Sequence, residues 1–447
     1  MRVPSKWLSI ASLIVVSAEA APAWALQPLA QFVAAAEAQS VDAAEARATA
    51  TQRSEEEKQA WAKLAPSVSA HADMTHNQFV PPFPITFQNP ATGKSETQLV
   101  TVTPENQLDA SVALNVPIVD VGSWLRIGAA GATSAAARVR ADATGLDLAR
   151  SVSRTYYQIV AADASIDAAK RAVAASEQNA KVVADRLSAG TASDLDVQRA
   201  RAEVERARQT LAAAEGSYAT SKRALETATG VRPEDGAMPT LEDALTEEAP
   251  LAALEPGAAR LPAVRAAQLE AKAAARNAQA AWAALAPTIS GTASERVSCG
   301  YDKRGCEPIG FVNTAATYQL VLQANWNLDA TTYFGAKAQD AAHAAATARV
   351  RRAELAAHDD LFNAWQQVRT QIATARAAKA QLDASRKAAA LVRERYAVGS
   401  ATQLEVTQAD RDALEAEMSV IQAYADLAYA RELVRIDSGR PTSGARR

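Results

Sequence analysis

The stretch Gln59-Ala-Trp-Ala-Lys-Leu-Ala-Pro-Ser-Val-Ser69 changes character at its proline. The residues before Pro66 favour a helix, whereas those from Ser67 onward alternate between polar and apolar types with the period of a strand. Proline lacks a backbone N–H and its ring clashes with the preceding helical turn, so Pro66 marks the boundary. The stretch therefore predicts a junction between a helical region and a sheet.

The same junction occurs a second time. The stretch Ala280-Ala-Trp-Ala-Ala-Leu-Ala-Pro-Thr-Ile-Ser290 repeats the tryptophan, leucine, alanine and proline 221 positions later. Further along each half, residues 186–197 match residues 395–406 at an offset of 209. The offset falls from 221 to 209, so the first half holds 12 more residues between its two strands, where loops tolerate insertion. Matched segments in the same order indicate an internal duplication.

The sequence pattern of each half predicts the same order of elements: a helix, two strands separated by a loop, a long helix, a tight turn and a returning helix. The first helix is expected to run from Leu26 to Leu64. The long helix of the first half, from about 123 to 187, lacks proline and would measure about 90 Å, so it needs a partner helix along its length. The predicted segments are a signal peptide at 1–25, a first repeat at 26–232, a connector at 233–260 with one short helix near Leu241 to Leu245, a second repeat at 261–439 and a short tail at 440–447.

Each of the four predicted strands has one apolar face and one polar face rich in Gln, Asn and Ser. Between Leu108 and Ile118, for example, alternate residues are apolar. A water-filled lumen suits such a polar face, whereas a packed core does not. Four strands cannot close a barrel, for which about eight are needed, so several chains would each contribute four. An antiparallel sheet with one face in water shows the same alternation and is the alternative.

The N-terminus has the pattern of a secretory signal. Basic residues precede an apolar run from Trp7 to Ala18, and Ala23-Trp-Ala25 offers a cleavage site between small residues. The run is shorter than the roughly 20 residues of a membrane-spanning helix, and no later apolar run has that length. A net charge of −3 gives no reason to expect nucleic-acid binding, which usually needs a basic face.

The residues that could carry chemistry are few. Cys299 and Cys306 are the only cysteines, and in an exported protein we predict one local disulfide between them, with two free thiols as the alternative. Two cysteines alone do not make a metal site. The four histidines have no metal-ligand spacing, and no catalytic motif is present, so we predict no enzyme activity, no metal and no cofactor.

The chain resembles the TolC family of outer-membrane efflux and secretion channels from about residue 26 to 439, because its predicted elements follow the same order. The two junctions carry the resemblance together with the strand endings Val116-Pro-Ile-Val-Asp120 and Trp326-Asn-Leu-Asp329 and the turns at Gly190 and Gly399. The resemblance implies an α+β membrane protein in a homotrimer. Each chain would give four strands to a 12-stranded β-barrel in the outer membrane and long antiparallel helices to an α-helical tunnel in the periplasm, with the connector 233–260 in its equatorial region.

The implied function is a passive exit duct of a tripartite efflux or type I secretion system. Its implied partners are outer-membrane lipid, a periplasmic adaptor (membrane fusion) protein and an inner-membrane pump or ABC transporter. The alternative is a periplasmic coiled-coil adaptor or scaffold, which should carry one helical hairpin rather than two matched ones.

The resemblance also implies roles for residues at the two turns, where Gly190 and Gly399 mark the tips expected to contact an adaptor. Glu405 matches an acid with which the best-known family member constricts its pore. Gln408 occupies the next pore-facing position, where that member has a second acid, so the charge of the constriction is reduced here. An acid near a helix N-terminus also interacts favourably with the helix dipole.

A second set of tip residues implies a latch. Asp196 and Tyr396 match a pair that bridges neighbouring hairpins in the closed state of the family. The position of an arginine that joins this network is occupied by Ala401. We therefore expect a closed state that is held more loosely or by other contacts.

Overall fold

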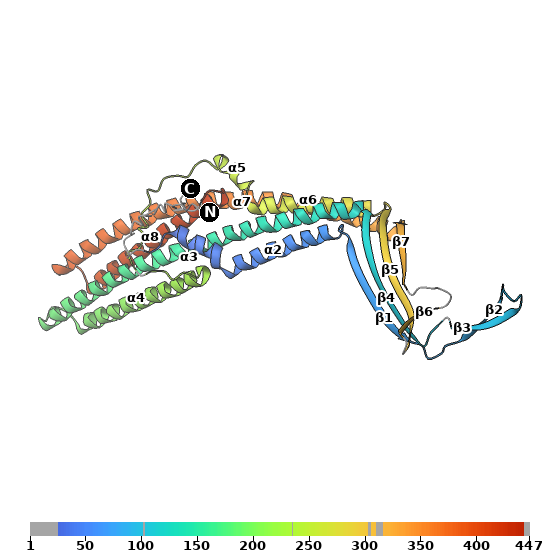
Figure 1. Ribbon diagram of the computed structural model, residues 1–447. Helices are drawn as coiled ribbons and strands as arrows, with labels where there is room; N and C mark the ends of the chain where they lie inside the picture. The colour runs from blue at the N-terminus through green and yellow to red at the C-terminus, as the bar shows by residue number, and fades with distance from the viewer. Residues whose placement is uncertain (1–25, 102, 235, 303–304, 310–315, 442–447) are drawn as a thin grey trace, which may run out of the picture.

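The computed structural model describes residues 26–101, 103–234, 236–302, 305–309 and 316–441. The chain is elongated, with long helices at one end and a sheet at the other (Figure 1). The predicted signal peptide at 1–25 and residues 442–447 of the predicted tail lie outside the described ranges.

Two antiparallel helical hairpins form the part of the molecule farthest from the sheet (Figure 1). In the first, α3 Val121–Ser188 turns into α4 Asp194–Thr229, and in the second, α7 Ala330–Ala397 turns into α8 Gln403–Asp437. Both α3 and α7 have 68 residues, which is about 100 Å of helix. The shorter helices are α1 Leu29–Gln39, α2 Val41–Ala62, α5 Glu255–Ala258, α6 Pro262–Ala283 and the 3₁₀ helix η1 Leu251–Ala253. Within the described ranges, no helix has both the length and the apolar character needed to cross a bilayer.

Two details of the helical prediction are wrong. The helix expected from Leu26 to Leu64 is broken at Ser40, whose backbone is extended and whose side chain accepts a hydrogen bond from Ala43 N, so it starts α2 as an N-cap. The short helix expected near Leu241 is absent from the structure there. Leu245 has a φ of 55° and donates its N–H to Asp243, which is a local turn contact that competes with helix.

The sheet contains the four predicted strands in the order β1-β4-β5-β7. β1 Ser67–His76 pairs with β4 Asn106–Val119, β4 with β5 Thr288–Asp302, and β5 with β7 Ala316–Asn325, each time antiparallel. Of the strands that the structure describes, β1 and β7 pair on one side only. Both edges of the sheet therefore keep a row of backbone donors and acceptors that another strand could use.

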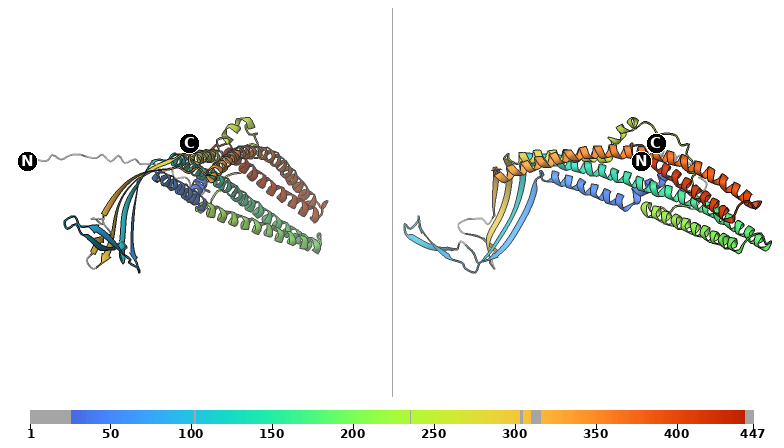
Figure 2. Two further views of the ribbon diagram at one scale, coloured as in Figure 1. Left: turned by 90° about the vertical axis from the view of Figure 1, so that its right-hand side faces the viewer. Right: turned by 180° about the vertical axis from the view of Figure 1, so that it is seen from behind.

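Three short strands were not predicted. β2 Pro82–Gln88 and β3 Ser95–Thr101 form a separate hairpin beyond the far end of the sheet, and β6 Gly305–Pro308 pairs with the outer end of β5 (Figures 1 and 2). The two prolines of β2 obscured it in the sequence because proline is uncommon inside strands.

The two helix-to-strand junctions have the same backbone hydrogen bonds. Leu64 N donates to Trp61 O and Ala65 N donates to Ala62 O, and the second junction repeats both bonds from Leu285 to Trp282 and from Ala286 to Ala283. The indole of Trp282 donates to both carboxylate oxygens of Asp340 at 3.1 Å, which joins α6 to α7. Trp61 instead meets Trp124 edge-on and stays half exposed. The duplication thus fixes the backbone of the junction but not the packing of its tryptophan.

The helical part buries its apolar side chains in two clusters near the middle of the long helices. One cluster joins α1 to α3, α4 and the end of α8, with Phe32 and Ile159 fully buried. The other joins α5, α6, α7 and α8 around Leu361 and Leu427. Ile436 of α8 joins the first cluster, and Leu146 of α3 packs against both, so the two clusters meet in a core from which the hairpins extend.

Candidate functional site

The turns of the two hairpins share one backbone design, and we call residues 186–197 the first tip and residues 395–406 the second tip. Gly190 has a φ of 74° and Gly399 a φ of 80°, which is the left-handed region that glycine adopts without strain at the end of a helix. One residue further, Thr191 N donates to Arg186 O at 2.8 Å, and the second tip has the same bond from Ser400 to Arg395.

Each returning helix begins with a capping box. At the first tip, the Ser193 hydroxyl donates to Asp196 Oδ2 at 2.7 Å while Asp196 N donates to the Ser193 hydroxyl oxygen. At the second tip, Thr402 N donates to Glu405 Oε2 at 2.6 Å in the same arrangement. The pKa of Glu405 is lowered, mainly by the hydrogen bond from the Thr402 backbone and next by the one from the Thr402 side chain. Both acids are thus structural caps of their helices.

The predicted constriction residues lie exposed along one face of α8. Glu405 is followed one turn later by Gln408, whose amide donates to Asp412 Oδ1 at 2.9 Å. Asp412 is also exposed, and the spacing 405, 408, 412 keeps these three side chains on one helix face. Asp412 was not among the residues predicted from the sequence, although this spacing indicates it. It restores an acid to this face one turn beyond Gln408.

The predicted latch residues have separate partners in this structure. The Asp196 carboxylate accepts from Ser193 within its own tip. Tyr396, in contrast, crosses between the hairpins and packs its ring against Val183, Val197 and Ala200 of the first hairpin. The pairing of Asp196 with Tyr396 stays a prediction.

Arg186 connects the two tips within one chain, and we call its contacts with Tyr396 the clasp. Its guanidinium lies over the Tyr396 ring at 4.3 Å and donates to the backbone carbonyls of Tyr396 at 3.0 Å and Ala397 at 3.2 Å. One side chain thereby stacks on an aromatic ring and occupies carbonyls at the C-terminal end of α7, where a cation is favourable. Arg186 is the first residue of the matched segment 186–197, and the match by itself predicts no role for it.

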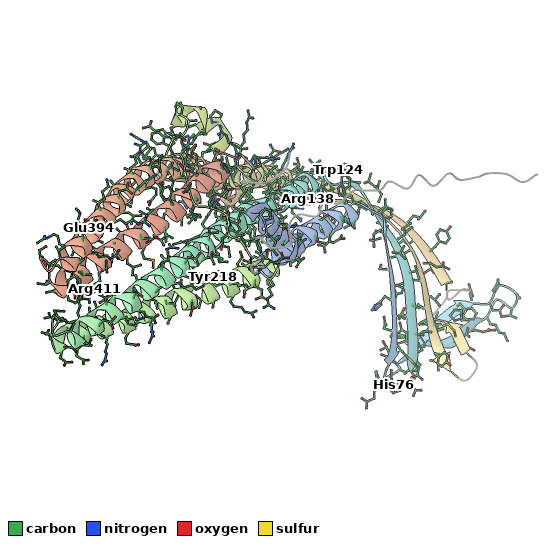
Figure 3. The ribbon with its side chains drawn as sticks, turned by 90° about the vertical axis from the view of Figure 1, so that its left-hand side faces the viewer. His76, Trp124, Arg138, Tyr218, Glu394 and Arg411 are labelled. Atoms are coloured by element: carbon green, nitrogen blue, oxygen red, sulfur yellow. A yellow bond between two sulfur atoms is a disulfide. The ribbon has the colours of Figure 1, made fainter. Side chains whose placement is uncertain are left out.

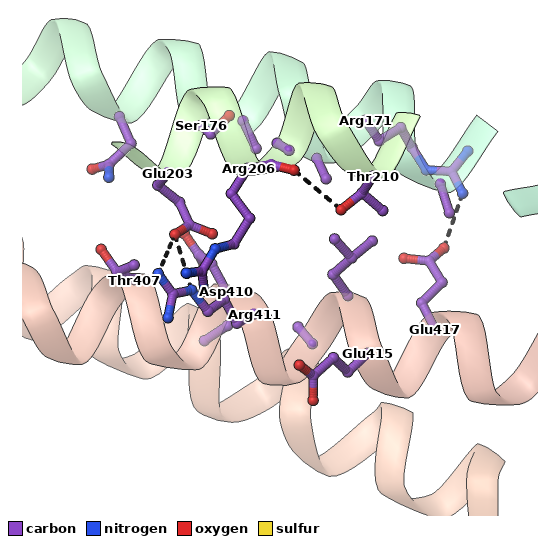
Figure 4. A pocket seen from close by; sticks show the side chains of 18 of the residues that line it. Arg171, Ser176, Glu203, Arg206, Thr210, Thr407, Asp410, Arg411, Glu415 and Glu417 are labelled. Atoms are coloured by element: carbon purple, nitrogen blue, oxygen red, sulfur yellow. Dashed lines mark hydrogen bonds and ion pairs between the residues drawn. The ribbon is translucent and has the colours of Figure 1, made fainter. Parts of the chain in front are cut away.

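A charged groove of about 610 Å³ lies between the hairpins behind the tips (Figure 4). Arg411 of α8 pairs with Glu203 of α4 at 2.5 Å, so the ion pair crosses from one hairpin to the other. Glu417 of α8 accepts from both Arg171 of α3 and Arg386 of α7 at 2.9 Å. Three helices therefore meet at one carboxylate, which adds a charged contact between the hairpins to the apolar contact of Tyr396.

Asp410 lies beside this network and is half buried. Burial raises its pKa, although the ion pair with Arg393 at 2.7 Å favours the charged form. Burial thus disfavours the charged form of Asp410, and Arg393 offsets part of this effect.

At the opposite end of the molecule, the structure joins Cys299 to Cys306 by a disulfide. Cys299 is fully buried, and the bond ties β5 to the short strand β6. No group of three or more His, Cys, Asp or Glu side chains within the described ranges is arranged to hold a metal ion.

The family of this chain follows from its sequence match. A family model described as outer membrane efflux protein matches residues 32–231 and 257–436, one segment in each half of the chain. The chain belongs to the outer membrane efflux protein family. The resemblance identified from the sequence is thereby confirmed, and the protein is a transport channel component rather than an enzyme.

Solved structures of channels share the fold over nearly the whole chain. CusC, described in terms of transmembrane channel formation, has a TM-score of 0.78 at 15% identity and covers 92% of both chains. The outer-membrane channel CmeC of Campylobacter jejuni has a TM-score of 0.75 at 15% identity, covering 98% of this chain and 93% of CmeC. The outer-membrane protein VceC of Vibrio cholerae has a TM-score of 0.73 at 16% identity, covering 92% of this chain and 96% of VceC. No curated protein sequence matches the chain significantly.

Proposed function

We propose that this chain is one subunit of a passive exit duct in the outer membrane, serving a tripartite efflux or type I secretion system. This proposal is carried by the sheet, which has one apolar face, one polar face and, among the described strands, two edges without a neighbour. Three copies joined edge to edge would give 12 strands, enough to close a barrel with lipid outside and water inside. The helices would continue the duct into the periplasm.

The exposure of the sheet supports this assembly. Leu320 and Leu322 of β7 are 76% and 74% exposed, and Val112 and Ile118 of β4 are also more than half exposed. These side chains share the apolar face, and lipid is the environment in which such a surface is stable. The aromatic side chains Tyr318 and Trp326 lie near the two ends of β7, where membrane interfaces favour them.

The tips are proposed to close the duct at its periplasmic end. Glu405, Gln408 and Asp412 would line the pore, so three copies would form stacked rings that attract cations. The first and second tips around Gly190 and Gly399 would meet a periplasmic adaptor, which connects the duct to an inner-membrane pump. In this proposal the segments 26–232 and 261–439 are two structural repeats, joined by a connector at 233–260 in the equatorial region of the tunnel.

The connector is held against the second hairpin by specific contacts that suit this position. Arg431 of α8 pairs with Asp243 at 2.8 Å and with Glu248 at 2.5 Å. The indole of Trp365 in α7 donates to Ala249 O at 3.1 Å.

The assembly is tested by expressing the full chain in a Gram-negative host and isolating the outer membrane. We expect an oligomer on unheated gels that becomes a monomer on heating, and stepwise conductance after reconstitution into planar bilayers. A soluble periplasmic monomer without conductance would instead support the adaptor alternative.

The latch is tested in the same bilayers with Asp196→Ala and Tyr396→Phe. Tyr396→Phe removes only the hydroxyl and keeps the ring under Arg186, so it separates the predicted latch from the clasp. If the latch holds the pore closed, both variants should raise the mean single-channel conductance above that of the unmodified protein. Unchanged conductance in both variants would refute the latch.

A further inference from the structure

Where β1, β4, β5 and β7 pair with one another, the polar face of the sheet carries charge only in one narrow zone. Glu307 of the short strand β6 lies one row farther out, opposite Gly300. Among the residues paired across β1, β4, β5 and β7, the side chains of this face nearest the helices are mainly hydroxyls and amides, including Ser67, Ser69, Asn115, Thr292, Ser294, Gln319 and Gln323. Within the pairings of these four strands, the titratable side chains of this face occur in two neighbouring rows: His71 lies in the row of Arg296, and Asp73 lies in the row of Asp109. We call these four residues the charged band.

The charged band lies toward the outer end of the sheet. Asp73 is three positions before His76, which marks the end of the sheet farthest from the helices (Figure 3). The tips lie at the opposite end of the molecule (Figure 1). The charged band is therefore separate from the predicted constriction at Glu405.

Contacts within the charged band pair each acid with a base. Arg296 donates to Asp109 Oδ1 through Nη2 at 2.6 Å and through Nε at 3.1 Å. His71 Nε2 lies 2.8 Å from Asp73 Oδ1. The Asp109 side chain is 13% exposed, whereas those of Asp73 and Arg296 are 47% and 60% exposed. Asp73 and Arg296 therefore present most of the charge to the water on this face.

The two acids are direct cross-strand neighbours. Asp73 pairs with Asp109 in the register of β1 and β4, and like charges at such positions destabilise a sheet. With histidine neutral, two carboxylates and one guanidinium leave one net negative charge per chain. Between the charged band and the helices the same face is built of neutral polar groups, so an arrangement that costs stability calls for a functional reason.

We propose that the charged band is a second selectivity zone of the duct, which favours cations over anions near the outer mouth. This inference rests on the proposed function, because only in a closed barrel does the polar face become a lumen. The carboxylates of Asp73 and Asp109 supply the attraction, and Arg296 weakens it. Three chains would place three net negative charges around the lumen.

Screening limits the range of this zone. The Debye length is about 3 Å at 1 M salt, about 10 Å at 0.1 M and about 30 Å at 0.01 M. A 12-stranded barrel is wider than the short screening lengths, so at high salt ions near the axis do not sense the wall. The preference for cations must therefore grow as the salt concentration falls.

The test uses single channels of the full-length protein in planar bilayers under a tenfold KCl gradient. All variants carry Glu405→Gln so that the tip charge contributes less to the measured selectivity. With KCl at about 10 and 100 mM, the double variant Asp73→Asn/Asp109→Asn should lower the cation-to-anion permeability ratio about twofold, and Arg296→Gln should raise it. Both shifts should disappear near 1 M KCl.

Glu295 provides a matched control. It precedes Arg296 in β5 but lies on the apolar face, opposite Val112 and Tyr318. Glu295→Gln removes the same charge from the outside of the barrel and should leave the permeability ratio unchanged. Heat-modifiable migration on gels shows that each variant has assembled.

Two results would overturn the inference: an unchanged ratio in the double variant at low salt, or an equal shift in Glu295→Gln. Either leaves the proposed function intact, since channels are still recorded. An unmodified protein that gives no current would instead refute the proposed function itself.

Discussion

The first tip and the second tip start from the same local design and end with different contacts. Both turn at a glycine with positive φ, and both begin the returning helix with a capping box. Arg186 and Arg395 occupy matching positions, yet Arg186 reaches across to Tyr396 and Ala397, whereas Arg395 donates to Ser400 O within its own tip at 3.0 Å. A duplicated segment thus keeps its backbone while one copy acquires a contact between the hairpins.

The two tips differ in the residue that follows each arginine. At the offset of 209, Tyr396 corresponds to Leu187, which is 37% exposed. A tyrosine ring gives Arg186 a surface on which to stack, while leucine offers Arg395 none. Tyr396 thus accounts for the stacking contact that Arg186 makes between the hairpins.

The largest expected effect comes from Tyr396→Ala. It removes the ring that packs on the first hairpin and supports Arg186, and should cost about 2 kcal/mol of local stability. Leu187→Ala, the matched change, should cost less than about 1 kcal/mol because its side chain is more exposed. Hydrogen exchange of the tip amides in the purified protein measures both. Equal effects would show that the two tips do not differ in this way.

A smaller effect is expected from Arg186→Lys. An ammonium cannot reproduce the paired carbonyl contacts and the stacking of a guanidinium, so the clasp should lose about 1 kcal/mol. Exchange should rise at both tips, and the mean single-channel conductance should increase as the hairpins loosen.

The control is Arg395→Lys, which should raise exchange only within the second tip. If Arg395→Lys loosened both tips as much as Arg186→Lys, the clasp would not be the connection between the hairpins.

The smallest effect is the pH dependence of the second cap. The pKa of Glu405 is lowered below 4.5 in the folded chain, so its stabilising contribution is present at neutral pH and is lost as the pH falls through the folded pKa. Amides in the first turn of α8 should keep constant protection, after correction for intrinsic exchange rates, from pH 7 to about 5 and lose it below about 4.5. Glu405→Gln accepts the same hydrogen bonds without titrating and should show no such loss. A loss of equal size in Glu405→Gln would assign the effect to another group.

Much of the architecture was predictable because its signals are local. The junction prolines, the tip glycines and the alternation in the strands each act within a few residues, and all three patterns appear in the structure at the expected positions. The break at Ser40 and the hairpin β2-β3 were missed because their local signals are weak. Serine is tolerated inside helices, and the prolines of β2 argue against a strand.

The sequence by itself determined the duplication, the order of long helices and strands, and the two faces of the sheet, because backbone propensity and side-chain period are properties of neighbouring residues. Only the tertiary structure decided which charged residues meet. Arg186 is 210 positions from Tyr396, Arg411 is 208 from Glu203, and Arg296 is 187 from Asp109. Such pairs depend on helix packing and strand register, in which a shift of one residue would turn each strand side chain to the other face.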